Sequence, residues 1–322
     1  MPDLPPDDPR FLKAYVKASG HNVEPRPRTG TIAAAVLAYE KSDHFISLAQ
    51  TTREQRRRVM RDIRRKVKGA TLADLRSRHI RQDLAAFTAN TANNRLKVWR
   101  AMGRWWLDAG LIEDDPAVAV RRRATPKTDG YEAWTADDVA MFRAHWPHDT
   151  QQRLAFELMF RTCASIGDAC RLGPQMVKDG WLTYTRSKSG SVAVIPMLDA
   201  PDWFGMDDHL ERCLDAAPRH MTYIVTSWGA PRSHKGASQW FSRASTAAGI
   251  APNKAAHGIR KYRAAQFLEG GANAEQRMAV LGHDTRTEAA RYSKSADLKK
   301  VISRTEVPTP PEQVPTFTKK GS

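Results

Sequence analysis

The chain of 322 residues has little cysteine and no long apolar run. Its three cysteines (Cys163, Cys170 and Cys213) are an odd number in a long chain, which favours reduced thiols over a disulfide framework. No apolar run approaches the roughly 18–20 residues of a membrane helix, since Ile32–Tyr39 is far too short. The N-terminal MPDLPPDDPR lacks the basic-then-apolar order of a secretory signal. We therefore expect a soluble, cytoplasmic protein that does not bind membranes.

The sequence also lacks the common nucleotide and metal motifs. It has no Walker loop, no GxGxxG after a strand and no Cys/His pattern with metal-ligand spacing. His145 and His148 are three residues apart but have no ligating companions. We interpret them as a solvated helix end and expect no metal site.

Acidic residues are too few to balance the basic ones. The chain has 51 Lys/Arg and 35 Asp/Glu, a net charge of +16. Residues 29–112 alone hold 17 Lys/Arg and 7 Asp/Glu. This excess predicts a polyanionic partner such as DNA. The candidate DNA-binding residues lie in one helical stretch: Arg56, Arg57, Arg61, Arg64, Arg65 and Lys68. A solvated helix face is the alternative interpretation.

Changes in composition divide the chain into five parts. Proline clusters near both ends predict flexible ends, and the aperiodic stretch between the two blocks predicts a linker. The expected parts are a flexible arm 1–28, a helical DNA-binding domain 29–112, a linker 113–133, a mixed domain 134–305 and a flexible tail 306–322.

The first block is predicted to be a bundle of four helices. The expected helices are Thr31–Tyr39, a second starting at Thr52 with Gln55 as its capping-box partner, His79–Phe87 and Thr91–Asp108. Trp99 and Trp106 lie at helical spacing, which indicates core positions, with stacking on bases as the alternative. Gly110 is expected to end the fourth helix in a left-handed conformation.

The second block mixes helices with a small β-hairpin. Thr135 with Asp138 is expected to open one helix, and Arg153–Leu172 is expected to form another. Trp181–Tyr184 and Val192–Pro196 are β-prone runs joined by RSKSG, which predicts a hairpin.

The residues with the clearest chemistry lie near the end of this block. His257-Gly258-Ile259-Arg260 is followed by Leu281-Gly282-His283 and then by Tyr292. Arg and His donors can neutralise a phosphodiester in its transition state. A tyrosine hydroxyl can attack phosphorus when a base and nearby cations favour its ionised form. The set therefore fits transfer of a DNA phosphoryl group to a protein nucleophile.

The combination of HxxR, LGH and a tyrosine at this spacing resembles the tyrosine recombinases of the phage integrase family. The resemblance extends over nearly all of residues 29–300. It implies a mainly α-helical fold with a small β-hairpin or sheet, consisting of a four-helix, SAM-like core-binding domain and a mixed α+β catalytic domain. Lys188 in the RSKSG turn resembles the family's β-hairpin lysine.

The resemblance also implies a role for each residue. Tyr292 would form a 3′-phosphotyrosyl link, Arg260 would clamp the phosphate, and His257 would serve as base or phosphate ligand. His283 would bond a non-bridging oxygen, and Lys188 would protonate the leaving 5′-oxygen. The reaction implies no cofactor, neither ATP nor metal, and its partners would be a double-stranded recombination site and three further copies, as a tetramer on two sites.

One position departs from the family pattern. The family's first catalytic arginine lies in a segment reading T-G-x-R-x-x-E/D, and here Thr162–Asp168 aligns with it. Asp168 falls on the acidic, supporting position, and Ser165 replaces the arginine. Losing such an arginine costs roughly 10³–10⁵-fold, so a weakened or inactive enzyme is expected. In the alternative, Arg161, one turn earlier, leans toward the phosphate.

Two other functions fit the same residues. A recombinase-fold protein that binds DNA with little or no catalysis is the runner-up, motivated by Ser165. A type IB topoisomerase shares the chemistry but is disfavoured because the layout resembles integrases throughout. The tail 306–322 is expected to dock on a neighbouring copy, as such tails do in similar proteins.

Overall fold

The computed structural model describes the chain apart from a few short segments. The described residues are 5, 8–18, 27–67, 69–126, 130–254 and 256–303. Lys68, the tail 306–322 and most of the arm outside 8–18 therefore lie outside the described residues. The chain folds as two compact units, Met1–Lys127 and Thr128–Ser322. The division falls inside the stretch expected to be a linker.

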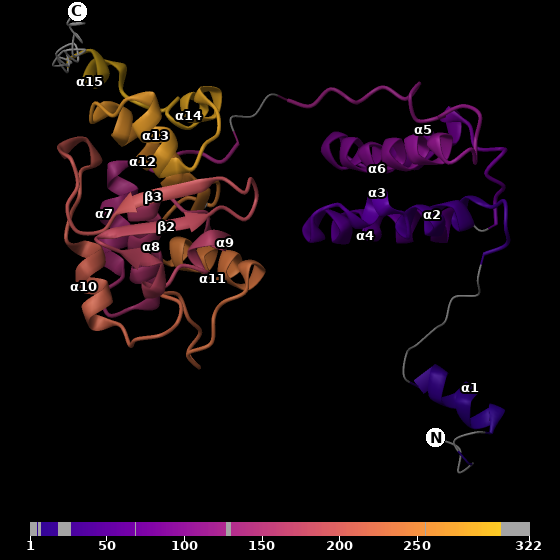
Figure 1. Ribbon diagram of the computed structural model, residues 1–322, viewed down its shortest axis with the longest axis horizontal. Coiled ribbons are helices and arrows are strands. Elements are labelled where there is room, and N and C mark those ends of the chain that lie inside the picture. The colour runs from indigo at the N-terminus through magenta and orange to yellow at the C-terminus, as the bar shows by residue number, and fades with distance from the viewer. Residues whose placement is uncertain are drawn as a thin grey trace, which may run out of the picture. The chain divides into compact units, whose positions relative to one another are not determined.

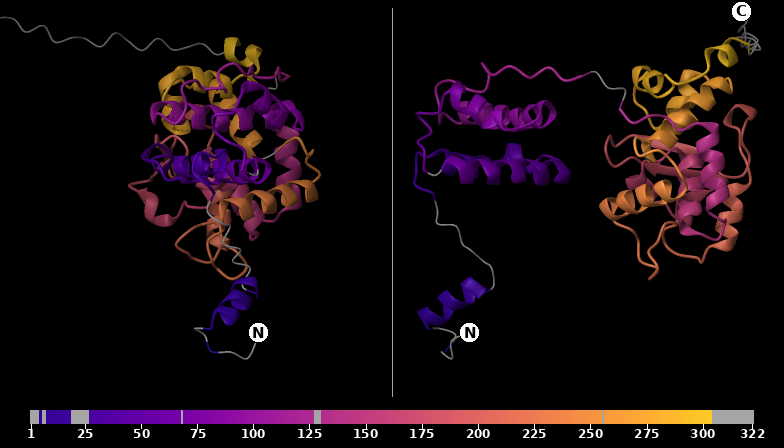
Figure 2. Two further views of the ribbon diagram at one scale, coloured as in Figure 1. Left: turned by 90° about the vertical axis from the view of Figure 1, so that its right-hand side faces the viewer. Right: turned by 180° about the vertical axis from the view of Figure 1, so that it is seen from behind.

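The first unit is helical. Its elements are α1 (Pro9–Ala18), α2 (Ile32–Glu40), α3 (Asp43–Ile46), α4 (Gln50–Val67), α5 (Ser77–Ala85) and α6 (Ala89–Asp108). Thr31 caps α2 by accepting a hydrogen bond from Ala34 N at 3.2 Å. Helix α4 begins at Gln50, so the predicted cap at Thr52 is wrong. Figures 1 and 2 show α4 beside α2 and α6 beside α5, in two layers.

The two tryptophans predicted for the core are both buried. Trp106 is fully covered and donates its indole N–H to Ala35 O at 3.0 Å, while Trp99 donates to Asp83 at 2.8 Å. Each ring thus buries its apolar surface and still satisfies its polar nitrogen. The left-handed Gly110 after α6 is also confirmed, with φ +66°.

Part of the expected linker packs on the first unit. Arg123 donates to Phe87 O at 2.7 Å and Leu84 O at 2.9 Å, and its amide donates to Asn93 at 2.9 Å. These bonds satisfy carbonyls at the end of α5. The segment as far as Arg123 is therefore fixed to the helical unit.

The second unit surrounds a small sheet with helices. Its elements are α7 (Ala136–His145), α8 (Gln151–Thr162), α9 (Ile166–Ala169), η1 (Pro174–Met176), β1 (Val177–Lys178), β2 (Trp181–Thr185), β3 (Val192–Pro196), η2 (Asp202–Phe204), α10 (His209–Ala216), α11 (His234–Ala247), α12 (Ala256–Glu269), α13 (Ala274–Leu281), α14 (Arg286–Tyr292) and α15 (Leu298–Ser303). Thr135 and Asp138 form the predicted capping box of α7.

The sheet is antiparallel, in the order β1-β2-β3. The predicted hairpin is confirmed, with Leu182 opposite Ile195, and β1 was not predicted because it has only two residues. Figure 1 shows α12, α13 and α14 together beyond β3, with α10 and α11 on the other side of the strands. The fold is thus mainly helical with a small sheet, as predicted. No helix within the described ranges is long and apolar enough to cross a membrane.

The single helix predicted for Arg153–Leu172 is wrong. The chain leaves α8 at Cys163, which adopts a left-handed conformation with φ +51°, and resumes at α9. The apolar pattern continues across this break because Ala164 and Ile166 are buried as well. Hydrophobic periodicity therefore could not reveal it. The break turns the carbonyl of Cys163 toward Arg260, which donates to it.

Candidate active site

Helix α12 presents His257 and Arg260 one turn apart, and Gly258 fixes where that helix lies. Trp134 N donates to Gly258 O at 3.2 Å. A Cβ at Gly258 would lie 2.4 Å from Glu132 O and 2.8 Å from the Trp134 ring. The glycine of the HGIR motif therefore lets the segment before α7 pass directly against α12.

Arg260 is buried and connects three elements. Its Nη1 donates to Cys163 O at the end of α8, and its Nη2 donates to Leu281 O at the end of α13. Nη2 also lies 2.9 Å from His283 Nε2. The guanidinium carbon lies 5.1 Å from the centre of the Tyr292 ring, and the buried Nε has no hydrogen-bond partner in the part of the chain that the structure describes. The arginine is held rigidly beside the tyrosine.

Gly282 of the LGH motif ends α13 and contacts the β2–β3 hairpin. Its φ is +57°, and its carbonyl accepts from Arg186 Nη1 at 2.6 Å and Ser191 Oγ at 2.7 Å. A Cβ there would lie 2.7 Å from Arg186 Cδ and 3.2 Å from Ala193 Cβ. Glycine is thus required both by the backbone conformation and by the close approach of β3.

Tyr292 is the last residue of α14, whose start is capped by Thr285. Its half-buried ring lies 5.3 Å from the ring of His257 and 4.7 Å from that of His283, between centroids. Its hydroxyl has no hydrogen-bond partner among the residues that the structure describes. The structure therefore brings together the four motif side chains His257, Arg260, His283 and Tyr292.

Both histidines are neutral at neutral pH. Burial, followed by the charges of Arg260 and Arg186, lowers the pKa of His283 to about 3. Burial, followed by the charges of Arg260, Lys261, Lys188 and Arg186, lowers the pKa of His257 to about 4. His283 accepts from Arg260 at Nε2, which places its proton on Nδ1. A neutral His257 beside Tyr292 can accept a proton.

Lys188 lies at the exposed tip of the hairpin between β2 and β3. The turn is closed by Arg186 N, which donates to Ser191 O at 2.9 Å, and by Gly190, with φ +76°. Because the Lys188 charge contributes to the low pKa of His257, the hairpin brings this lysine to the same side of the unit.

Ser165 serves as the N-cap of α9. Its Oγ accepts from Asp168 N at 3.2 Å and donates to the Asp168 carboxylate at 2.8 Å. The same buried carboxylate accepts from Ser187 N at 3.0 Å and from Arg171 at 2.9 Å. Burial would raise the pKa of Asp168, but the hydrogen bonds, chiefly those from Ser187, outweigh it and hold the pKa low. Asp168 thus joins the start of α9 to the hairpin as an anion.

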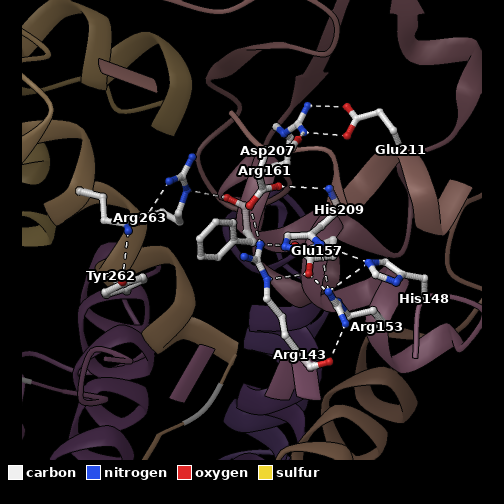
Figure 3. A network of polar contacts seen from close by, with 12 residues as sticks. Arg143, His148, Arg153, Glu157, Arg161, Asp207, His209, Glu211, Tyr262 and Arg263 are labelled. Atoms are coloured by element: carbon white, nitrogen blue, oxygen red, sulfur yellow. Dashed lines mark hydrogen bonds and ion pairs between the residues drawn. The ribbon is translucent and has the colours of Figure 1, made fainter. Parts of the chain in front are cut away.

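Arg161 does not lean toward this site, so the compensation considered for it is wrong. It is 3% exposed and bonds both carboxylate oxygens of Glu211, at 2.9 and 3.0 Å, and Asp207 O. Figure 3 shows it beside the buried network of Arg143, Arg153 and Glu157. The Glu211 carboxylate on α10 is part of the chain and pairs with Arg161 as soon as the protein folds. A phosphate would have to arrive with the DNA and displace it.

His148 belongs to this network and is not a solvated helix end. Its Nε2 lies 3.1 Å from His209 Nδ1 and 3.2 Å from Arg153 Nη2 (Figure 3). Burial and the charge of Arg153 lower the pKa of His148. Among the described residues, no group of His, Cys, Asp or Glu side chains could hold a metal ion.

Sequence reasoning missed Arg186. This half-buried residue bonds Gly282, and its charge contributes to the low pKa of both His257 and His283. The available signal was an arginine two residues before the hairpin lysine, in RSKSG.

The predicted DNA-binding arginines of α4 differ in their surroundings. Arg56 donates to Tyr39 Oη at 2.6 Å, and Arg57 pairs with Glu40 at 2.8 Å and lies over the Phe45 ring. Arg61 and Arg65 are exposed, and Arg65 lies 3.5 Å from Asp62. Arg64 is partly buried. The exposed members are therefore better placed to meet a ligand than the paired ones.

Residues 136–299 match the phage integrase family. The chain belongs to this family. The match covers half of the chain and includes Ser165, Lys188 and every residue from His257 to Tyr292.

Individual relatives agree with this assignment. The chain is 28% identical over 249 residues to the integrase of Escherichia phage HK022, covering 73% of this chain and 68% of the relative. It is 28% identical over 229 residues to the tyrosine recombinase XerD of Mycobacterium leprae, covering 65% of this chain and 71% of the relative.

Solved structures share the fold. A lambda integrase dimer bound to a COC′ core site matches with a TM-score of 0.69 and 24% identity, covering 82% of this chain and 95% of that one. A lambda integrase tetramer bound to a Holliday junction matches with a TM-score of 0.69 and 22% identity, covering 88% and 90%. At this identity the likeness establishes the fold.

Proposed function

We propose that this integrase-family protein cleaves and rejoins DNA strands at specific sites, with Tyr292 as the nucleophile. The observation that carries the proposal is the position of the Tyr292 ring, which meets Arg260 at 5.1 Å, His257 at 5.3 Å and His283 at 4.7 Å. These residues come from α12, the turn after α13, and α14. Their convergence is what phosphoryl transfer to a phenol needs.

In the proposed reaction, Tyr292 Oη forms a bond to the scissile phosphorus as the bond to the 5′-oxygen breaks. The phenolic proton passes to neutral His257, and Lys188 protonates the departing 5′-oxygen. Arg260 neutralises the charge on the non-bridging oxygens, with His283 as a further ligand of one of them. A 5′-hydroxyl of a partner strand reverses the step, so the bond energy is kept and no cofactor enters the balance.

The proposed partner is double-stranded DNA, bound by several copies of the chain. The net charge of +16 and the exposed arginines of α4 supply the attraction to phosphates. The related lambda integrase has been solved as a dimer on a core site and as a tetramer on a Holliday junction. We extend this to a tetramer on two sites for the present chain.

The decisive experiment uses a duplex with a nick placed next to the scissile phosphate, so that the leaving strand diffuses away and the covalent adduct accumulates. Its sequence is first selected from a pool of randomised duplexes retained by the protein. Wild type should give a protein–DNA adduct that survives denaturant, and Tyr292→Phe should give none while it still binds. Tyr223→Phe, a partly buried tyrosine of the same unit, is the control.

The second candidate function is DNA binding without catalysis. Ser165, a neutral N-cap where the family has an arginine, favours it. It predicts a salt-sensitive shift of the selected duplex in gels with no adduct in any wild-type reaction. An adduct formed by wild type excludes this candidate.

A further inference from the structure

The substitution at Ser165 removes a cation from the start of α9, and a different cation stands close to it. Ser165 and Ser187 bind the same carboxylate, that of Asp168, through Ser165 Oγ at 2.8 Å and Ser187 N at 3.0 Å. Arg186 immediately precedes Ser187. The hairpin thus carries an arginine to the neighbourhood where the serine has replaced one.

The backbone of Arg186 is fixed by the hairpin. Its amide donates to Ser191 O at 2.9 Å, and its carbonyl accepts from Gly190 N at 2.9 Å. Its side chain crosses to the end of α13, where Nη1 donates to Gly282 O at 2.6 Å. The guanidinium is therefore anchored one residue before His283.

Arg186 acts electrostatically on the site. Its charge contributes to the low pKa of His257 and of His283. Its own pKa is lowered by burial and then by the charge of Arg260, and is opposed by Tyr184, Tyr292 and Asp168. All four proposed catalytic groups from α12 to α14 thus interact with this guanidinium.

The contacts of Arg186 leave its phosphate-binding edge available. Nη1 is used by Gly282, whereas Nε and Nη2 have no hydrogen-bond partner within the described parts of the chain, where no carboxylate pairs with the side chain either. These two N–H groups form the parallel fork with which arginine binds a carboxylate or phosphate. The Asp168 carboxylate attracts Arg186 electrostatically, but among the described residues neither Arg186 nor Arg260 forms an ion pair with a carboxylate.

Arg171 is the competing candidate and fits less well. Its side chain is 54% exposed and is committed to Asp168 at 2.9 Å and to Thr185 O at 3.2 Å. Its charge is not among the causes that lower the pKa of either histidine.

We propose that Arg186 is a catalytic residue that binds a non-bridging oxygen of the scissile phosphate and replaces the cation missing at Ser165. The proposal rests on the proposed function. It predicts an active enzyme in which the second arginine of the site comes from the hairpin.

The first test measures adduct formation on the selected nicked duplex with saturating protein. Arg186→Gln should form the adduct on the order of 10²–10³-fold more slowly than wild type, and gel shifts should show much smaller changes in binding. Adding Ser165→Arg to that variant should recover much of the rate, because the cation returns by the other route. Arg212→Gln, which removes an equal charge from the surface of α10, should match wild type.

The second test separates contact with the phosphate from support of the hairpin. A methylphosphonate at the scissile position replaces one charged oxygen by methyl. If Arg186 neutralises that oxygen, the loss caused by Arg186→Gln should nearly vanish on at least one diastereomer. A structural role would give the same loss on both substrates, which would overturn the proposal.

If Arg186→Gln does not fold, the same comparison is made with Arg186→Lys, which keeps the charge but loses the fork. If wild type forms the adduct and the folded variant forms it at the same rate, the role of Arg186 is refuted while the proposed function stands. The absence of an adduct for both wild type and Ser165→Arg refutes the proposed function itself.

Discussion

Arginine occupies opposite situations at two places, the core of the first unit and the Tyr292 site of the second. In the first unit, buried Arg95 pairs with Asp62 at 2.8 Å and with Asp83 at 2.5 Å, and Arg57 pairs with Glu40. In the second, Arg186 and Arg260 lie near each other and hydrogen-bond carbonyl groups, with no carboxylate partner among the described residues. The density of positive charge is higher along α4, where acidic side chains pair with part of it, whereas the guanidiniums near the histidines and Tyr292 have no carboxylate partner among the described residues. Arginines that converge without carboxylate partners therefore identify an anion-binding site better than a large number of arginines does.

The largest effect should come from changing Arg260, the central unbalanced cation. Arg260→Lys keeps the charge but loses the planar fork whose two nitrogens, Nη1 and Nη2, donate separately to Cys163 O and Leu281 O. Adduct formation should slow on the order of 10²–10³-fold. Arg95→Lys is the matched change at a balanced site and should lower the melting temperature while leaving the rate at saturation close to wild type. If Arg260→Lys and Arg95→Lys slowed adduct formation equally, the distinction between the two kinds of arginine site would be contradicted.

The stability of the packing between the β2–β3 hairpin and the end of α13 should depend on the side-chain volume at Gly282. Gly282→Ala would force a Cβ against Arg186 Cδ and Ala193 at a positive φ. We expect a loss of about 2–4 kcal/mol in unfolding free energy, from left-handed strain and overpacking together. Gly249→Ala has a similar φ, +82°, and nothing within 4 Å of the new Cβ. It should lose only about 1–2 kcal/mol. Equal losses in denaturant unfolding would remove the packing argument.

Acid should destabilise the cation-rich site through its histidines. The pKa of His283 falls from an ordinary 6.5 to about 3 in the folded protein, so the unfolded chain binds more protons between these values. The contribution of His283 to the free energy of unfolding is therefore fully present above pH 6.5 and is lost as the pH falls toward 3. The cost from this residue is about 3 kcal/mol at pH 4. His283→Gln should lose less stability than wild type between pH 7 and pH 4 in thermal melts. Parallel curves for the two proteins would contradict the assignment.

The smallest effect should distinguish the arginines of α4 from one another. Exposed Arg61→Gln should reduce the slope of log affinity against log salt by about 1. Arg57→Gln removes a cation that already pairs with Glu40 and lies over Phe45, so its slope should change less. Identical changes in both variants would mean that the intramolecular pairs give way to DNA, and would weaken the division between balanced and unbalanced charge.

The sequence predicted the site better than it predicted the residues that support it. His257, Arg260, His283 and Tyr292 belong to motifs whose glycines, such as Gly258 and Gly282, have clear steric reasons in the structure. The two long helices of the first unit, α4 and α6, were likewise predictable because their apolar spacing is regular. The helices depend on local spacing and the site residues on short motifs, although Gly258 and Gly282 make their close contacts with residues far away in the chain.

The failures share a different cause. The turn at Cys163 could not be seen because apolar residues continue through it, and its conformation accompanies a bond from Arg260, 97 positions later. The orientation of the Arg161 side chain is determined by Glu211 on α10, and that of Arg186 by the carbonyl of Gly282. Each depends on a partner distant in the chain, which propensity and periodicity do not report.

The most direct test of the account is to identify the amino acid that carries the DNA. Wild-type adduct on the selected nicked duplex is digested with nuclease and trypsin, and the peptides are analysed by mass spectrometry. The account predicts a nucleotide attached through its 3′-phosphate to Tyr292, in the short peptide that follows Arg291 and ends at Lys294. A nucleotide on any other residue, or a duplex cut with no covalent attachment to the protein, would contradict it.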